Sequence, residues 1–281
     1  MISELGTTAD ALAEIEATLA VNEVAPGRFT SPNIPIPGMR RLFGGQLLAQ
    51  VTAVAARSAE GKDVKSLHTT FLAEGRPGTE VTYEARKVRD GRSFATRLVE
   101  GGQPGRLLLS ALVSCHAPER GLEHHVPPPD VPGPDDLPPS PALGPDGAVE
   151  ARLVGGPDLP GPDPGEPVLH MWLRARRRLG DDLLSHQGVL AYSSDLTLMS
   201  TLIRPHPGVR LGDPATLTSA ATTHTIWFHR PFRIDEWLLF TQRGPSTYGG
   251  RGFATGDWYT ADGVLVASCA QEALLRVRGS E

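Results

Sequence analysis

The sequence predicts an α+β fold made of two copies of one small domain, each an antiparallel sheet with one long helix on one face. Residues 42–58, "LFGGQLLAQVTAVAARS", have the apolar spacing of a buried helix. The runs "EVTYEARKVRD" (80–90) and "EWLLFTQRG" (236–244) have the composition of strands. The word "GRSFATR" at 91–97 returns as "GRGFATG" at 250–256. Helix, strands and repeated word together indicate a duplicated sheet-and-helix unit.

The duplication rests on more than one repeated word. Four pairs of features keep the same order and a nearly constant separation along the chain. The pairs are Gln46 with Asp195, His68 with His224, Gly91 with Gly250, and Cys115 with Cys269. A repeat of this length is too long for a solenoid unit, so each copy is expected to be a domain.

The two copies are separated by a segment of different composition. More than half of the chain's 26 prolines lie between Pro127 and Pro167, where apolar residues are few. Such a segment cannot form a packed element of any length. We therefore expect a first repeat at 1–125, which includes an N-terminal helix, a linker at 126–166, and a second repeat at 167–281.

The composition excludes several classes of protein. A net charge of −5, with 21% charged and 40% hydrophobic residues, gives no bias toward nucleic acid. No run is apolar enough to span a membrane, and residues 1–21 have the pattern of an amphipathic helix without the basic start of a signal peptide. Cys115 and Cys269 lie in apolar runs typical of buried thiols. These features predict a cytoplasmic protein.

The motifs of several enzyme classes are missing from the sequence. There is no G-x-S-x-G word, no phosphate-binding loop, and no G-x-G-x-x-G after a strand. The nine histidines include no H-E-x-x-H pattern. We therefore expect neither a metal nor a cofactor.

Asp195 and Gln271 are the candidate acid-base pair. Asp195 stands at the head of the uncharged segment "LTLMS", where an aspartate is expected to cap a helix N-terminus. Gln271 follows Cys269 by two residues, so both side chains share one face of the closing strand. In the first copy the matching residues are Gln46 and Ala117. A carboxylate and an amide can activate and orient one water, and a nearby helix N-terminus can stabilise an oxyanion.

These residues resemble a known family. The strings "FGGQLLAQ", "RDGRSFATR", "HQGVLAYSSDL", "HTIWFHRPFRIDEWLL" and "GRGFATGDWYTADGVLVASCAQE" are similar to those of the acyl-CoA thioesterase II (TesB-like) family. The resemblance implies a double hotdog fold, in which two fused repeats each wrap a curled antiparallel sheet around one long helix. It also implies hydrolysis of acyl-CoA to free fatty acid and CoA, a water positioned by Asp, Thr or Ser, and Gln, and association into homo-oligomers.

Two of the three family residues carry over, namely the Asp as Asp195 and the Gln as Gln271. The Thr or Ser position falls on Ala221 in "SAATTHTIWFH". In a strand, residues 219, 221 and 223 share a face, so the hydroxyl of Ser219 or Thr223 could replace it, and we take Thr223 as the catalytic candidate. Thr222 would require a one-residue slip and a bulge.

Further residues are candidates for the substrate cleft. Gly45 and Gln46, at the start of the first repeat's helix, and Arg251 and Gly252, in the repeated turn, are assigned to substrate binding. His68 and His224 are expected to pack or hydrogen-bond within strands. The pair Ala73-Glu74 stands where the family usually has Arg-Pro, a difference expected to alter the cleft.

The resemblance leaves alternatives to hydrolysis. Because Ala221 replaces a hydroxyl, the chain could bind acyl-CoA without cleaving it, which predicts saturable binding and no thiol release. A hotdog hydratase acting on enoyl-CoA is the third reading. It ranks below the others because "SSDLTLMST" lacks the Asn-Pro and His of the hydratase word.

Overall fold

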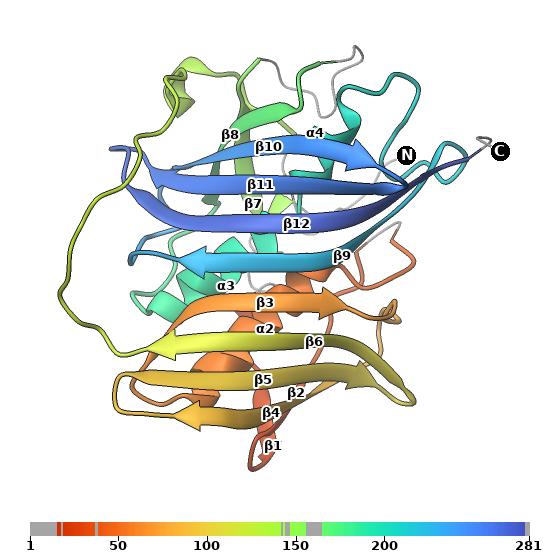
Figure 1. Cartoon of the computed structure of the whole chain (residues 1–281). Helices are drawn as coiled ribbons and strands as arrows, with labels where there is room; N and C mark the ends of the chain where they lie inside the picture. Colours follow the sequence, from red (N-terminus) through yellow and green to blue (C-terminus); the bar gives the residue numbers. More distant parts are fainter. Residues whose placement is uncertain are drawn as a thin grey trace, which may run out of the picture.

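The computed structural model describes residues 16–17, 19–36, 39–141, 143, 147–155 and 165–278. In this part of the chain the strands form one twelve-stranded sheet in the order β1-β2-β4-β5-β6-β3-β9-β12-β11-β10-β8-β7. Figure 1 shows the sheet curving in front of two helices, α2 and α3. The predicted double hotdog is therefore confirmed.

Each half contributes two strands, a long helix and four further strands, and the second half adds the short helix α4. The first half holds β1 (Asn22–Ala25), β2 (Arg28–Ser31), α2 (Gly44–Ser58), β3 (Asp63–Phe71), β4 (Val81–Asp90), β5 (Phe94–Gln103) and β6 (Arg106–His116). The second holds β7 (Val149–Leu153), β8 (Val168–Ala175), α3 (Leu183–Ser194), α4 (Leu198–Ile203), β9 (Leu217–Phe228), β10 (Leu238–Tyr248), β11 (Arg251–Thr260) and β12 (Leu265–Val277). Between the halves lies the 3₁₀ turn η1 (Pro134–Asp136).

The two halves join through one pair of central strands. β3 and β9 are antiparallel, with Leu67 opposite Ile226, and the strand order on one side of this pair mirrors the order on the other. Both central residues are fully buried against the helices. The duplication expected from the repeated words is thus a duplication of the whole sheet-and-helix unit.

Some of the predicted residue pairs are not equivalent in the structure. Gln46 is the third residue of α2, whereas Asp195 follows the last residue of α3 as its C-cap. The helix in the second repeat begins earlier than expected, because Asp182 caps Leu183–Ser194 and accepts a hydrogen bond from the Ser185 amide. The prediction that Asp195 opens a helix is therefore wrong.

Strand register corrects two further pairs. Ala95 in the first repeated word lies opposite Cys115, and Ala254 in the second lies opposite Gln271. With the repeated words aligned, the counterpart of Gln271 is Cys115, two residues from the predicted Ala117. His68 is exposed on the outer face of the sheet, whereas His224 is fully buried against the helices, so these two residues are not equivalent either.

The proline-rich segment contains more structure than its composition suggests. β7 lies within 126–166 and pairs with β8 at the edge of the sheet, with Val149 and Leu153 buried. The segment also packs on the second repeat, where Trp172 Nε1 donates to the Pro132 carbonyl at 2.9 Å. The expectation that it forms no packed element is wrong for this strand. The division of the chain at 126 and 166 stays a prediction.

Two further sequence expectations concern the membrane and the N-terminus. Within the described residues, none of the helices combines the length and apolar character needed to cross a membrane. The helix expected in residues 1–21 falls mainly outside the described part of the chain. Cys115 and Cys269 are buried free thiols, as expected from their apolar runs.

The close approach of α2 to α3 determines where the site lies. A Cβ atom placed on Gly45 would lie 2.3 Å from the backbone carbonyl oxygen of Tyr192 in α3. The contact is to backbone, so no side-chain rotation could relieve it. Glycine at this position therefore allows the start of α2 to pack directly against the end of α3.

Gly45→Ala is expected to lower the free energy of unfolding by about 1–3 kcal/mol, because the added methyl group forces the two helices apart. The measurement is chemical denaturation of both proteins. Gly121→Ala is the control, since a Cβ there meets no atom within 4 Å. Equal stability of the two variants would contradict this account of the helix contact.

Candidate active site

The candidate site is a cavity of about 550 Å³ between the two repeats. The first repeat contributes Phe43 and Gly44 at the start of α2 and Phe71 at the end of β3. The second contributes Asp195 and Met199. Apart from Arg41, Glu74 and two hydroxyl residues, the other lining residues are apolar or glycine, so the cavity suits a hydrophobic ligand beside the Asp195 carboxylate.

Asp195 lies between the ends of two helices from different repeats. It is the C-cap of α3, and its carboxylate accepts a hydrogen bond from the Gly45 amide in the first turn of α2. A Cβ on Gly44 would lie 2.6 Å from Asp195 Oδ2, which shows how closely the helix start approaches the carboxylate. A negative charge is stabilised at a helix N-terminus. Asp195 therefore sits at a helix N-terminus as expected, but the helix belongs to the other repeat.

Burial dominates the protonation of Asp195. The residue is 6% exposed, and loss of hydration raises its pKa to about 7. The hydrogen bonds from Gln271 and Gly45 and the positive charge of Arg41 act in the opposite direction, since each favours the carboxylate. The group therefore exchanges its proton near neutral pH, where a general base is most effective.

Gln271 and His224 complete a buried chain of hydrogen bonds. Gln271 Nε2 donates to Asp195 Oδ1 and lies 3.2 Å from His224 Nδ1, and His224 Nε2 lies 3.0 Å from Ser194 Oγ. Burial lowers the pKa of His224 to about 3, so the ring is neutral and one ring nitrogen must accept.

The direction of each bond in this chain can be deduced from Ser194. Its hydroxyl donates to the Ala191 carbonyl at 2.8 Å, so its oxygen accepts the proton on His224 Nε2. His224 Nδ1 then accepts a hydrogen bond from the Gln271 amide nitrogen, which also donates to Asp195 Oδ1. Gln271 Oε1 is left buried with no hydrogen-bond partner among the described residues. His224 thereby orients the Gln271 side-chain amide so that its nitrogen is hydrogen-bonded and its oxygen remains available as an acceptor.

The third predicted catalytic residue does not join this group. Thr223 is opposite Thr70 in β3 and next to the inward-facing His224, so its side chain faces the outer side of the sheet. The register of β9 against β12 shifts at this point, because Glu272 pairs with Thr223 and Ala273 with Ala221. Thr222 is the extra residue of this bulge.

The bulge brings Ala221 and Thr222 to the cavity, together with Ser219. Thr222 Oγ1 donates to the Glu272 carbonyl at 3.0 Å, which leaves its lone pairs available as acceptors. Thr222, next to Ala221, therefore brings a hydroxyl to the cavity, although the sequence disfavoured this residue because it needs a bulge.

The four predicted substrate-binding residues separate into two places. Gly45 lies at the site and bonds Asp195, and Gln46 next to it is buried with Oε1 accepting from the Ile34 amide at 3.2 Å. Within the part of the chain that the structure describes, Gln46 Nε2 has no hydrogen-bond partner. Arg251 lies elsewhere, at a second pocket, where its guanidinium pairs with Glu272 at 3.2 Å. Gly252 does not line that pocket but packs under it, since a Cβ there would lie 2.7 Å from Leu202 and 2.8 Å from Leu275.

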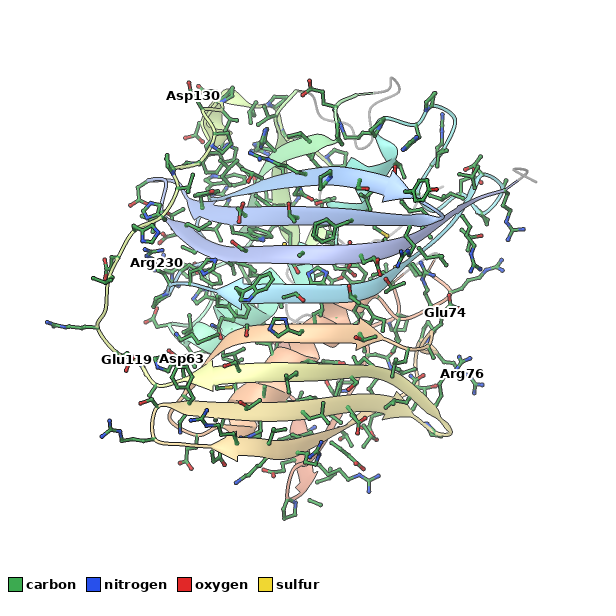
Figure 2. All side chains as sticks on the ribbon, in the orientation of Figure 1. Asp63, Glu74, Arg76, Glu119, Asp130 and Arg230 are labelled. Atoms are coloured by element: carbon green, nitrogen blue, oxygen red, sulfur yellow. The ribbon has the colours of Figure 1, made fainter. Side chains whose placement is uncertain are left out.

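Sequence reasoning missed Arg41, whose guanidinium lines the cavity. It bonds the Ser219 carbonyl at 2.6 Å and Glu74 at 3.0 Å, and so links the two repeats. The Ala73-Glu74 pair, which departs from the family, lines the same cavity. Glu74 lies at the edge of the molecule beside the end of β3 (Figure 2). Arg41 directly precedes the quoted "LFGGQ" segment, and this proximity was its only signal in the sequence.

Comparison with known proteins places this geometry in a family. Residues 34–116 match the family "Acyl-CoA thioesterase N-terminal domain" and residues 123–275 match "Acyl-CoA thioesterase C-terminal domain". The chain is 32% identical over 269 residues to mouse acyl-coenzyme A thioesterase 8, covering 86% of this chain and 82% of that protein. The chain belongs to the acyl-CoA thioesterase II family.

Solved structures agree with the thioesterase II assignment. The crystal structure of acyl-CoA thioesterase II TesB2 from Mycobacterium marinum superposes with a TM-score of 0.82 at 33% identity, covering 95% of this chain and all of that one. A hotdog-fold protein from Alicyclobacillus acidocaldarius superposes with a TM-score of 0.77 at 22% identity, covering 93% and 97%, which supports the fold alone. In this thioesterase, the residues described include no cluster of three or more His, Cys, Asp or Glu side chains suited to a metal ion.

The raised pKa of Asp195 predicts a pH-dependent stability. The folded protein keeps a proton on Asp195 up to about pH 7, whereas the unfolded chain releases it near the ordinary carboxyl value of 3.8. The free energy of unfolding contributed by this group is therefore complete below about pH 4 and is lost as the pH rises through 7. Asp195→Asn should remove this loss, on the order of 2–4 kcal/mol between pH 4 and pH 8.

The measurement is urea unfolding of wild type and Asp195→Asn at a series of pH values, with the difference in unfolding free energy plotted against pH. A difference that does not change between pH 4 and pH 8 would show that burial does not raise the pKa.

Proposed function

We propose that this chain hydrolyses acyl-CoA to free fatty acid and CoA, using a water activated by Asp195 and oriented by Gln271, with no covalent intermediate. The observation that carries the proposal is a buried carboxylate that titrates near neutral pH in a largely apolar cavity. The family membership supports the same reaction and the same substrate class.

The chemical step needs only groups present at the site. Asp195 removes a proton from water as the oxygen attacks the thioester carbonyl carbon. The carbonyl becomes an oxyanion, the carbon–sulfur bond then breaks, and the thiolate of CoA takes the proton back from Asp195. Water supplies the new oxygen of the fatty acid, so no other reactant is required.

Gln271 is suited to orient the water through its free acceptor. Its amide nitrogen donates to Asp195 and His224, and its buried Oε1 has no partner in the described ranges of the chain. A water that donates one proton to Asp195 and the other to Oε1 would be held with a lone pair free for attack. His224 acts as a positioning residue, because it prevents the amide from turning its oxygen toward Asp195.

The start of α2 is suited to stabilise the oxyanion. Its N-cap residue, Phe43, offers no side-chain hydrogen bond, and Gly44 lines the cavity. Amide N–H groups in a first helical turn lack partners within the helix and point toward a bound anion. The hydroxyl oxygen of Thr222, at the cavity wall, is a second acceptor for a water proton besides Gln271 Oε1. In our assignment Thr222 replaces Thr223.

Binding without catalysis is the second candidate function, because Ala221 lines the cavity at the position of the family hydroxyl. A thiol-release assay with purified protein separates the two functions. Release of CoA from acyl-CoA supports hydrolysis, whereas saturable binding of acyl-CoA with no release at any chain length would establish a binding protein.

Asp195→Asn is expected to lower the rate constant for thiol release by roughly 10²–10⁴-fold, because the base is removed while the shape is retained. In the wild type the same rate should rise with pH and level off above about 7, as Asp195 ionises. Activity is followed by reaction of free CoA with a thiol reagent. Turnover by Asp195→Asn at the wild-type rate would exclude the proposed base.

His224→Leu is expected to lower kcat by roughly 10²-fold with little change in KM, because the Gln271 amide is then free to rotate. His224→Gln should recover part of kcat, since an amide can both accept from Gln271 and donate to Ser194. Equal losses in the Leu and Gln variants, or a loss confined to KM, would contradict a positioning role.

A further inference from the structure

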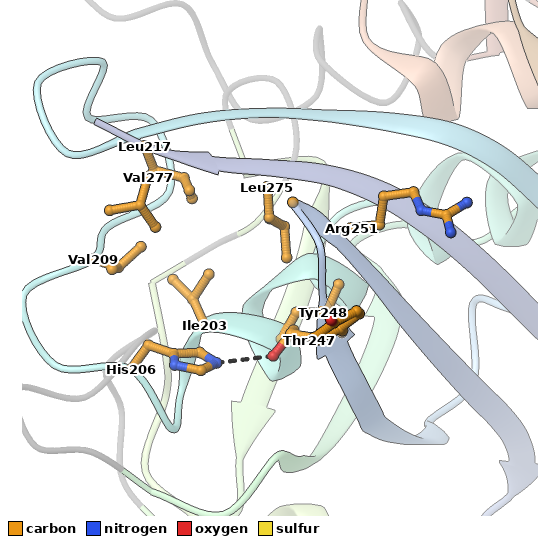
Figure 3. A pocket seen from close by; sticks show the side chains of 11 residues that line it. Ile203, His206, Val209, Leu217, Thr247, Tyr248, Arg251, Leu275 and Val277 are labelled. Atoms are coloured by element: carbon orange, nitrogen blue, oxygen red, sulfur yellow. Dashed lines mark hydrogen bonds between the residues drawn. The ribbon is translucent and has the colours of Figure 1, made fainter. Parts of the chain in front are cut away.

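A second pocket lies beside the cavity that contains Asp195. It has a volume of about 220 Å³ and is lined mainly by aliphatic side chains, among them Leu202, Ile203, Leu217, Leu275 and Val277 (Figure 3). The catalytic proposal uses none of these residues.

The two pockets adjoin across neighbouring strands. Ser219 lines the main cavity and lies directly opposite Leu275 of the second pocket, in the ladder between β9 and β12. Directly opposite residues in an antiparallel ladder have Cα atoms about 4.5–5.5 Å apart. Along β12, positions 271, 273, 275 and 277 share one face, so the second pocket continues the row that starts at Gln271.

Helix α4 gives a second, independent connection. Leu196, just before α4, and Met199 within it line the main cavity, and Leu202 and Ile203 line the second pocket. Residues three and four positions apart are neighbours on a helix surface. One apolar stripe of α4 therefore runs from beside Asp195 into the second pocket.

The ring of His206 and the charge of Arg251, at the rim of the second pocket, each already have a partner. His206 Nε2 bonds Thr247 Oγ1 at 3.0 Å, and the Arg251 guanidinium extends away from the aliphatic side chains (Figure 3) and pairs with Glu272. A ligand in this pocket would meet hydrocarbon and no free charge. The pocket is therefore suited to an alkyl chain and unsuited to the phosphates or adenine of CoA.

We propose that this second pocket binds the distal methylene groups of the substrate's acyl chain, and that the side chains lining it limit the length of chain the protein accepts. The assignment rests on the proposed function, because the main cavity must hold the thioester beside Asp195. It gives Leu275, Leu217 and Leu202 the role of setting chain length.

The test is Leu275→Trp, which fills the pocket without changing any residue at Asp195. We expect kcat/KM for long acyl chains to fall at least tenfold, since each methylene group excluded from a hydrophobic pocket costs roughly 10-fold or more. Butanoyl-CoA, which does not reach the pocket, should be hydrolysed as by the wild type. Leu122→Trp is the matched control, because Leu122 is fully exposed.

Leu275→Ala is the second variant, and it enlarges the pocket. It should shift the preference toward longer chains. A series from butanoyl- to octadecanoyl-CoA in the thiol-release assay compares all four proteins. A uniform change in kcat/KM at every chain length, or none in either Leu275 variant, would overturn the assignment.

A binding measurement separates failure of this assignment from failure of the proposed function. Alkyl thioethers of CoA cannot be hydrolysed, and their dissociation constants can be measured by calorimetry. If no acyl-CoA releases thiol but Leu275→Trp weakens only the long-chain thioethers, the pocket stands and hydrolysis fails. If thiol is released and all thioethers bind both proteins alike, hydrolysis stands and the pocket assignment fails.

Discussion

The site depends on the contact between the start of α2 and the end of α3. Gly45 lets the backbone of one helix approach the backbone of the other, and the approach brings the free amides of the first repeat's helix to a carboxylate of the second. Neither repeat could form this arrangement alone, because each supplies one half of it. The central pairing of β3 with β9 holds the two helices at this distance. The double sheet is thus the frame that keeps one helix N-terminus against one buried acid.

A buried carboxylate is costly unless neighbours stabilise its charge. At Asp195 the stabilisation is incomplete, since burial outweighs the bonds from Gln271 and Gly45 and raises the pKa to about 7. Stronger hydrogen-bond donors would stabilise the charged carboxylate and the folded protein. They would also lower the pKa of Asp195 and so make it too weak a base. The neutral His224 fits this balance, because a charged ring beside Asp195 would lower the pKa of the carboxyl. The chain from Ser194 to Gln271 therefore orients the amide while adding no charge.

The sequence was sufficient for the fold, for the duplication and for the meeting of Asp195 with Gln271. It failed where the outcome depended on the end of an element. Helix-like apolar residues precede and follow "AYSSDL" in the sequence. The local pattern therefore did not show that Asp195 ends α3 and faces the start of α2. Thr223 was chosen by strict alternation, and a bulge at Thr222 breaks that alternation. β7 formed inside the proline-rich segment because the sheet edge of β8 provided hydrogen bonds that composition cannot reveal. Helix ends, bulges and edge pairing are set by tertiary contacts.

The two halves have specialised at matching places. Asp195 is the C-cap of α3, whereas the C-cap of α2 is Ala59. At the end of α2, the buried Arg97 donates to the Ser58 carbonyl at 2.7 Å and pairs with Asp90 at 2.7 Å. Arg97 is the last residue of "GRSFATR", and the repeated word has Gly256 there, where a side chain would collide with Phe240. A cation bonding the carbonyl end of a helix is a stabilising arrangement. One half therefore closes its helix end with an ion pair, and the other keeps its helix end open to a cavity with a carboxylate in it.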